Sequence, residues 1–128
     1  MKVLLDTHTF LWFVLNSSQL SQNARQVLED SNTDVFISPA SYWEMAIKVR
    51  KGNLELLCSY DEFMKKGIVG NDFEILPVSV SHTSQLTTQP EHHRDPFDRL
   101  IIAQAIVESL PLVGNDAAFD DYGVNRIW

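Results

Sequence analysis

Four acidic residues from four separate segments are the residues in this chain whose types and positions could do chemistry. Each stands where a short apolar run gives way to helix-starting residues, and they are Asp6, Glu44, Asp98 and Asp116. Two carboxylates about 4 Å apart repel by roughly 4 kcal/mol at an effective dielectric constant of 20, so a shared pocket would need a cation. Carboxylate oxygens suit hard divalent ions. The sequence therefore predicts that these four residues hold Mg²⁺ or Mn²⁺ and form a catalytic centre.

Three apolar runs would carry two of these acids to one edge of a sheet. Val3–Leu5, Val35–Ile37 and Leu112–Val113 are short, rich in β-branched and aliphatic residues, and bounded by polar residues, which is typical of buried strands. If these strands are parallel neighbours, Asp6 and Asp116 project from their carboxyl ends. In open α/β sheets that edge is where ligands bind.

The other two acids are expected on helices. Ser38 before Pro39 is a typical N-cap and first helical residue, which predicts a helix to Lys51 with Glu44 inside it. Asp95-Pro96 begins the longest apolar helix, Phe97 to about Ser109, with Asp98 in its first turn. Further helices are expected near residues 7–15, 21–30, 59–67 and 81–86, and further strands near 73–76 and 125–128. This alternation predicts an α/β fold, with a parallel sheet flanked by helices, as one domain over residues 1–128.

Each acid also has an ordinary structural explanation. Asp6 could be the N-cap of the first helix, and Asp116 could belong to a turn. Glu44 stands four residues before Lys48, the favourable spacing for a surface ion pair. Asp98 could simply stabilise the positive end of its helix. One acid alone is therefore weak evidence, and the hypothesis depends on the four meeting in space.

Composition limits the function classes. The chain has 128 residues, 45% of them hydrophobic, and a net charge of −7, which indicates a folded domain and counts against a purely electrostatic nucleic-acid binder. Local basic groups remain at helix ends and faces and beside Asp98, namely Lys48, Arg50, Lys51, Lys65, Lys66, Arg94 and Arg99, but no basic groove of any length is expected from them. The apolar segment Phe10–Leu15 is far below the roughly 20 residues that cross a bilayer, and no secretory signal is recognisable, so a cytoplasmic protein without membrane contact is expected. Cys58 is the single cysteine and excludes an internal disulfide.

The histidines do not suggest a better site. His8, His82, His92 and His93 lack the i, i+4 spacing of a zinc helix, and the pair His92-His93 is expected in a surface loop. His8, close to Asp6, could reach the rim of the acidic pocket. No phosphate-binding glycine loop, serine nucleophile elbow or Cys/His dyad is present, so covalent catalysis has no candidate.

Three segments carry patterns found together in one family. They are Val3–His8 (VLLDTH), Ser38–Lys48 (SPASYWEMAIK) and His93–Ala105 (HRDPFDRLIIAQA). In order and spacing they resemble a PIN domain, in particular the VapC-type toxins of toxin–antitoxin systems. The resemblance implies a five-stranded parallel sheet, metal-dependent ribonuclease activity and a small antitoxin as partner. By position, the family's four acids fall on Asp6, Glu44, Asp98 and Asp116. One departure is Gly114, where relatives often have Thr or Ser, and it bears on the orientation of Asp116.

The leading hypothesis is thus an endoribonuclease toxin that cleaves RNA phosphodiesters with Mg²⁺ or Mn²⁺ and leaves a 5′-phosphate. Two alternatives stay open: an acidic receiver-like signalling domain, and a non-catalytic binding module. Four aromatic residues exceed what a small core must contain, namely Trp12, Phe13, Trp43 and Phe63. They are either core residues or part of a homodimer face or an antitoxin groove.

Overall fold

Five short strands form one parallel sheet in the computed structural model, which describes residues 1–128. The strands are β1 (Lys2–Leu5), β2 (Asp34–Ile37), β3 (Glu74–Ile75), β4 (Leu112–Val113) and β5 (Arg126–Ile127). Their order in the sheet is β3-β2-β1-β4-β5, and every neighbouring pair is parallel. The predicted α/β fold with a five-stranded parallel sheet is confirmed, although β3 and β5 are shorter than the sequence indicated.

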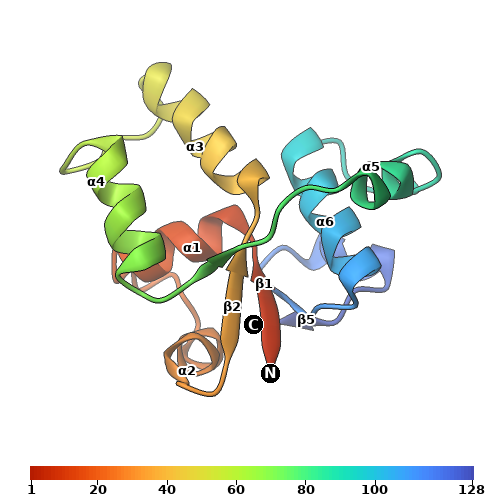
Figure 1. The fold of residues 1–128 in the computed structure, drawn as a ribbon, viewed down its shortest axis with the longest axis horizontal. Coiled ribbons are helices and arrows are strands. Elements are labelled where there is room, and N and C mark those ends of the chain that lie inside the picture. The colour runs from red at the N-terminus through yellow and green to blue at the C-terminus, as the bar shows by residue number, and fades with distance from the viewer.

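Helices connect the strands and flank the sheet, with α1, α2 and α4 to one side and α5 and α6 to the other (Figure 1). They are α1 (Thr7–Val14), α2 (Gln22–Glu29), α3 (Pro39–Arg50), α4 (Tyr60–Met64), α5 (Val80–Leu86) and α6 (Pro96–Glu108). A π-helical segment, η1 (Lys65–Val69), prolongs α4, and a 3₁₀ helix, η2 (Ala117–Tyr122), follows β4. No helix was expected at η2 from the sequence. None of the helices combines the length and the apolar character that a membrane span requires.

The predicted N-caps fix where the two acid-bearing helices begin. The Ser38 hydroxyl accepts a hydrogen bond from the backbone N–H of Ala40 at 3.0 Å, at the start of α3. At the start of α6, Asp95 Oδ1 accepts from the backbone N–H groups of Phe97 and Asp98 at 2.9 and 3.4 Å. Each cap satisfies N–H groups that have no partner within the helix. The register of both helices, and so the direction of their acidic side chains, follows from these caps.

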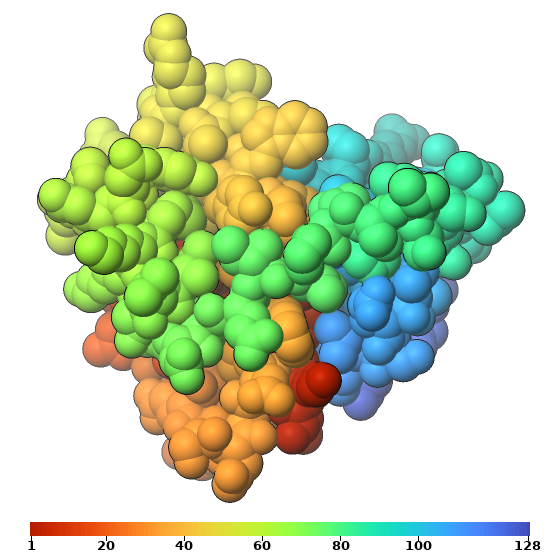
Figure 2. Space-filling model, viewed as in Figure 1, coloured from red at the N-terminus to blue at the C-terminus, as the bar shows by residue number.

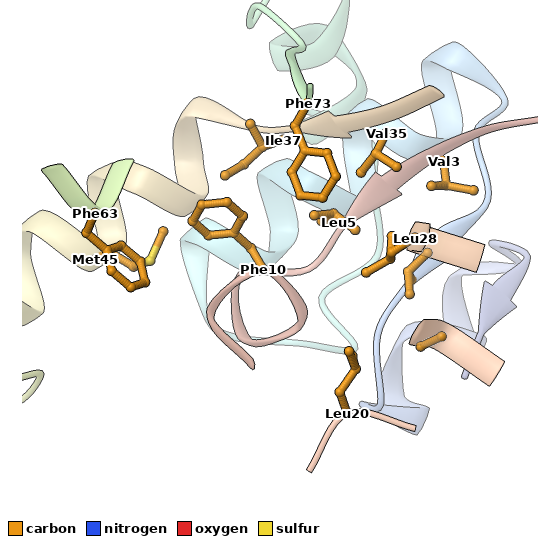
Figure 3. Close-up of a cluster of buried hydrophobic side chains, with 12 residues drawn as sticks. Val3, Leu5, Phe10, Leu20, Leu28, Val35, Ile37, Met45, Phe63 and Phe73 are labelled. Carbon is orange, nitrogen blue, oxygen red and sulfur yellow. The ribbon is translucent and has the colours of Figure 1, made fainter. Parts of the chain in front are cut away.

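Alternation along the strands divides the core between the two faces of the sheet. On β1, Val3 and Leu5 belong to one hydrophobic cluster and Leu4 to another, because successive strand side chains point to opposite faces. In the larger cluster the Phe10 ring of α1 lies between Phe63 and Phe73, with ring centroids 6.2 and 6.4 Å away (Figure 3). The smaller cluster is built on α6: its members are Leu4, Ala40, Ile101, Ile102, Ala105, Leu112 and Phe119.

The chain changes direction at β1. The connections after β1 and β2 add strands on one side of β1, whereas β4 and β5 are added on its other side. The segment from η1 through β3 to α5 makes this change, and it runs across the face of the molecule that Figure 2 shows, in green. The carboxyl ends of β1 and β4 therefore lie at the topological switch point, where open α/β sheets bind ligands.

Candidate metal centre

Asp6 follows β1 at the switch point and is almost completely buried, with 4% of its side chain exposed. Its backbone N–H donates to the carbonyl of Val113 at 3.0 Å, which fixes the residue against the end of β4. Asp6 occupies the N-cap position of α1, but its side chain makes no capping hydrogen bond. The capping explanation therefore does not account for this buried carboxylate. The neighbouring Thr7 hydroxyl donates to Ser41 Oγ at 3.0 Å and so ties α1 to α3.

Asp116 follows β4 and has two contacts. Its Oδ1 accepts from the backbone N–H of Ala118 at 2.9 Å and caps η2, so its expected turn role is realised. Its Oδ2 lies 3.1 Å from Nε2 of His93. Gly114 brings this segment close to Asp6: a Cβ at position 114 would lie 3.0 Å from the Asp6 Cβ. The glycine thus leaves the room that the buried aspartate occupies.

Asp98 and His93 meet at the first turn of α6. Oδ2 of Asp98 lies 3.2 Å from Nε2 of His93, so this ring nitrogen faces both Asp98 and Asp116. Nδ1 of His93 accepts from the backbone N–H of Asp95 at 3.2 Å, which in the neutral ring leaves the proton on Nε2, facing the carboxylates. Ligand atoms of His93, Asp98 and Asp116 all lie within 4.8 Å of one another.

The expectation that His92-His93 lies in a surface loop is therefore wrong for His93, whose side chain is 19% exposed. His92 is exposed and packs edge-on against Tyr122, with ring centroids 5.2 Å apart. The sequence held one usable signal for His93. It stands two residues before the N-cap Asp95, so the chain must turn back over the first helical turn, where Asp98 lies.

Glu44 lies on α3 and is 6% exposed. Its Oε2 pairs with Nζ of Lys48 at 3.0 Å, as the i, i+4 spacing predicted, whereas its Oε1 is buried without any hydrogen-bond partner. The ion pair with Lys48 therefore accounts for Oε2 of Glu44 but not for Oε1. Because a buried acceptor without a partner costs free energy, Oε1 is an atom from which a bound ligand would gain.

The four carboxylates act on one another electrostatically. Burial, followed by the charges of Asp6, Asp95, Glu44 and Asp116, raises the pKa of Asp98 from 3.8 to about 8. Burial also raises the pKa of Asp6, from 3.8 to about 6, although His8 opposes the shift. Both shifts show that the folded chain disfavours negative charge at this point unless a positive charge joins it.

A pocket of about 410 Å³ contains three of the four acids. Asp6, His8, Trp12, Asp98, Asn115, Asp116, Ala117 and Phe119 line it, so His8 does reach its rim. Glu44 is not in this lining and borders a neighbouring groove, yet its charge acts on both Asp6 and Asp98. The structure thus brings all four predicted residues to one region, with three in a common pocket and Glu44 beside them.

The residues fit a hard divalent cation. The available donors are carboxylate oxygens, which Mg²⁺ and Mn²⁺ prefer, and one of them, Oε1 of Glu44, is buried without a partner. The raised pKa of Asp98 shows repulsion that a cation would relieve. In the tautomer with the hydrogen on Nε2, His93 donates to the carboxylates of Asp98 and Asp116, and metal-binding carboxylates are held by such hydrogen bonds.

The sheet order contradicts the receiver-like alternative. Receiver domains have the flavodoxin-like order 2-1-3-4-5, in which β1 lies between β2 and β3. Here β1 lies between β2 and β4, and β3 is at the edge. A phosphate-accepting aspartate after β1 would therefore have different neighbours from those in a receiver.

Comparisons with solved structures find the same fold. The chain matches the VapBC2 complex of Rickettsia felis bound to a promoter DNA fragment with a TM-score of 0.72 and 18% identity, over 100% of both chains. It matches FitAcB from Neisseria gonorrhoeae with a TM-score of 0.66 and 21% identity, over 98% of this chain and 96% of that one. It matches VapBC-5 from Mycobacterium tuberculosis with a TM-score of 0.61 and 18% identity, over 98% of this chain and 94% of that one. At these identities the likeness is one of fold.

Comparison with family sequences is more specific. No curated protein sequence matches the chain. The sequence model of the PIN domain family, however, matches residues 3–125, which include all four acids and every strand except β5, apart from Lys2 at the start of β1. This chain belongs to the PIN domain family.

Proposed function

We propose that this protein is a divalent-metal-dependent endoribonuclease in which Asp6, Glu44, Asp98 and Asp116 hold Mg²⁺ or Mn²⁺. The observation that carries the proposal is the gathering of these carboxylates at the switch point, where burial, followed by the charges of the neighbouring acids, raises the pKa of Asp98 to about 8. The PIN family is a family of nucleases, and its sequence model spans residues 3–125. We also propose that residues 1–128 form a single catalytic domain.

Each residue would contribute in a way that follows from its environment. Asp6 and Asp98 are the most buried acids of the pocket and offer carboxylate oxygens that no Lys or Arg pairs. Glu44 offers Oε1 while Lys48 holds Oε2, and Asp116 offers Oδ2 while Oδ1 caps η2. His93 donates from Nε2 and keeps the Asp98 and Asp116 side chains together.

When bound, the ion would activate a water for attack on the phosphodiester and neutralise charge on the phosphate oxygens. The protein's part is to exclude other water and to fix the carboxylates before the substrate arrives. Burial of Asp6 between β1 and α1 and the cap at Asp95 supply that rigidity, because neither depends on a loop.

We further propose that the protein is the toxin of a toxin–antitoxin pair, bound by a small antitoxin and able to form a homodimer. The solved structures of similar fold support this proposal, since VapBC-5 belongs by its description to the VapBC family of toxin–antitoxin systems. The substrate proposed is RNA. Co-expression with the neighbouring reading frame would test the partner: recovery of the chain alone would contradict it.

The nuclease proposal is tested by incubating purified protein with structured RNAs in Mg²⁺ or Mn²⁺. Wild type should produce fragments with 5′-phosphate ends, EDTA should stop the reaction, and Asp6→Asn and Asp98→Asn should each reduce the rate by at least about a hundredfold. Asp61→Asn, an exposed acid on α4, is the matched control and should cleave normally. Equal cleavage by Asp6→Asn and wild type would contradict the proposed centre. Carboxylate-dependent Mn²⁺ binding without cleavage would instead favour a binding module.

A further inference from the structure

A second groove lies beside the acidic pocket, with a volume of about 490 Å³. Its wall comes from α3, the turn after it, and the segment that leads into α6. The lining residues are Glu44, Ile47, Lys48, Lys51, Asn53, Arg94, Asp95, Pro96 and Phe97. Two of them connect it to the metal centre: Glu44 acts electrostatically on Asp6 and Asp98, and Phe97 immediately precedes Asp98. A ligand in this groove would therefore lie next to the acidic pocket.

The groove is basic, although the chain as a whole has a net charge of −7. Three of the chain's 10 Lys and Arg residues line it, namely Lys48, Lys51 and Arg94. The sequence did not show these three cations together because Lys48 and Lys51 come from the end of α3 and Arg94 from a segment more than 40 positions later. The expectation that the protein has no basic groove is therefore wrong, since folding brings these cations together.

Two of the three cations are free for a ligand. Lys48 is paired with Glu44, but neither Lys51 nor Arg94 forms an ion pair, and both are exposed. The other acid in the lining, Asp95, already accepts two backbone N–H groups as the N-cap of α6. With three cations against the two acids Glu44 and Asp95, the groove lining has a small positive excess, and its two unpaired cations can bind phosphate groups.

An exposed aromatic ring stands at the edge of the same groove. Trp43 is 60% exposed, whereas Trp12 and Phe13 pack against the core and Phe63 is buried within it. Its indole contacts the Phe97 ring edge-on, with centroids 5.1 Å apart, and Trp43 lies one helical turn before Ile47 of the groove wall. Phe97 thus packs against Trp43 while more than half of the Trp43 residue stays exposed to solvent.

We propose that this groove binds a segment of single-stranded RNA next to the acidic pocket, with Lys51 and Arg94 on phosphates and Trp43 stacked on an unpaired base. The inference rests on the proposed nuclease function, because it supplies a path by which a negatively charged substrate reaches a negatively charged centre. Cations that follow the backbone and an aromatic ring that stacks on bases are the combination by which proteins bind single strands. Trp43 and the two cations are then substrate-binding residues outside the metal centre.

The test measures binding separately from cleavage. The fluorescence anisotropy of a labelled 12-nucleotide single-stranded RNA is followed in EDTA at several salt concentrations. The double variant Lys51→Glu/Arg94→Glu should weaken RNA binding on the order of tenfold or more. The slope of log K against log salt should become shallower by about 1.4, because two phosphate contacts are lost. Lys65→Glu/Lys66→Glu, which makes the same change of charge on η1, is the matched control and should have a much smaller effect. Trp43→Ala should weaken binding on the order of tenfold, and Leu57→Ala, an exposed apolar control, should not.

Cleavage with Mn²⁺, measured on the same variants, separates this proposal from the nuclease proposal. If wild type does not cleave but the groove variants lose RNA binding, the groove proposal stands and the nuclease proposal fails. If wild type cleaves and the groove and control variants bind alike, the groove proposal fails alone. Loss of a dimer by Trp43→Ala in light scattering, with unchanged RNA affinity, would assign this face to a second copy of the chain and overturn the proposal.

Discussion

Nζ of Lys48 lies 3.0 Å from Oε2 of Glu44, while Oε1 of the same carboxylate is buried without a partner. An unsatisfied buried acceptor costs about 1–3 kcal/mol. One side chain thus combines an ordinary helical ion pair with a buried acceptor that has no partner in the folded chain. The two halves can be separated by mutation, because Lys48 contacts Oε2 and leaves Oε1 unpaired.

Replacing Glu44 should lower the affinity for metal, whereas replacing Lys48 should not. Glu44→Gln keeps the shape but removes the charge, so Mn²⁺ affinity, measured by calorimetry, should fall by about tenfold or more. Lys48→Met removes the competing cation and should leave Mn²⁺ affinity unchanged or increase it. Equal loss of affinity in both variants would indicate that the ion pair serves only to support the fold.

Stability in the absence of metal should fall as the pH rises. The pKa of Asp98 is about 8 in the folded chain against 3.8 ordinarily, so between these values unfolding releases a proton. The stability is therefore fully present below about pH 4 and is lost as the pH rises through about 8; Asp6, with a pKa of about 6, changes stability in the same direction. In EDTA the melting temperature should be higher at pH 5 than at pH 8.

Two comparisons make this pH prediction specific to the centre. Asp98→Asn, which cannot ionise, should flatten the pH dependence and raise the melting temperature at pH 8 by about 5 °C. Mn²⁺ should stabilise wild type more at pH 8 than at pH 5, because more of the Asp6 and Asp98 carboxylates are ionised at pH 8. A melting temperature that rises from pH 5 to pH 8 in EDTA would contradict the electrostatic description of the pocket.

His93 should act through the carboxylates that it holds. His93→Ala removes the donor at Nε2, 3.1 Å from Asp116 and 3.2 Å from Asp98, and should lower Mn²⁺ affinity by about 10- to 100-fold. His93→Gln places an amide N–H near the same position and should restore much of that affinity. His92→Ala is the neighbouring control and should bind normally, because His92 contacts only Tyr122 among the aromatic rings. Failure of glutamine to restore binding, with the fold intact, would indicate that His93 is itself a ligand.

A side chain at Gly114 should be tolerated in this chain only if Asp6 or Phe119 moves. A Cβ there would lie 3.0 Å from the Asp6 Cβ and 3.3 Å from the Phe119 ring, and both neighbours are buried. Gly114→Ala should therefore cost about 1–3 kcal/mol of unfolding free energy and displace Asp6, with reduced metal affinity. Asn115→Ala, at the next and exposed position, is the control for urea denaturation. An unchanged Gly114→Ala protein would mean that β4 can shift away from β1 without loss.

The local structure around the acids could be predicted from neighbouring residues. Ser38-Pro39 and Asp95-Pro96 cap α3 and α6 as expected, because a cap is a contact between residues two or three positions apart. The spacing of Glu44 and Lys48 likewise gave the ion pair that forms. The extent of η1 and the formation of η2 were not predicted, since π and 3₁₀ turns depend on what the rest of the chain packs against them.

Two features of the site depend on contacts between distant parts of the chain. His93 was expected in a surface loop, yet its ring joins Asp98 to Asp116, which follows β4. The basic groove was not expected at all, because Arg94 reaches Lys48 and Lys51 only when α6 packs against α3. The position of His93 just before the N-cap Asp95 was the one local signal, and it pointed only to the first turn of α6, not to Asp116. The basic groove has no signature at short sequence spacing.

The sequence by itself thus determined the strands, the capped helices and the identity of the four acids, because apolar alternation and capping are local properties of the chain. Only the tertiary structure decided that β4 lies beside β1, which places Asp6 and Asp116 at one switch point, and which atoms of each acid remain unpartnered. The physical reason is that burial and Coulomb interactions depend on distances between residues far apart in sequence. Those distances, and not residue type, raise the pKa of Asp98 to about 8.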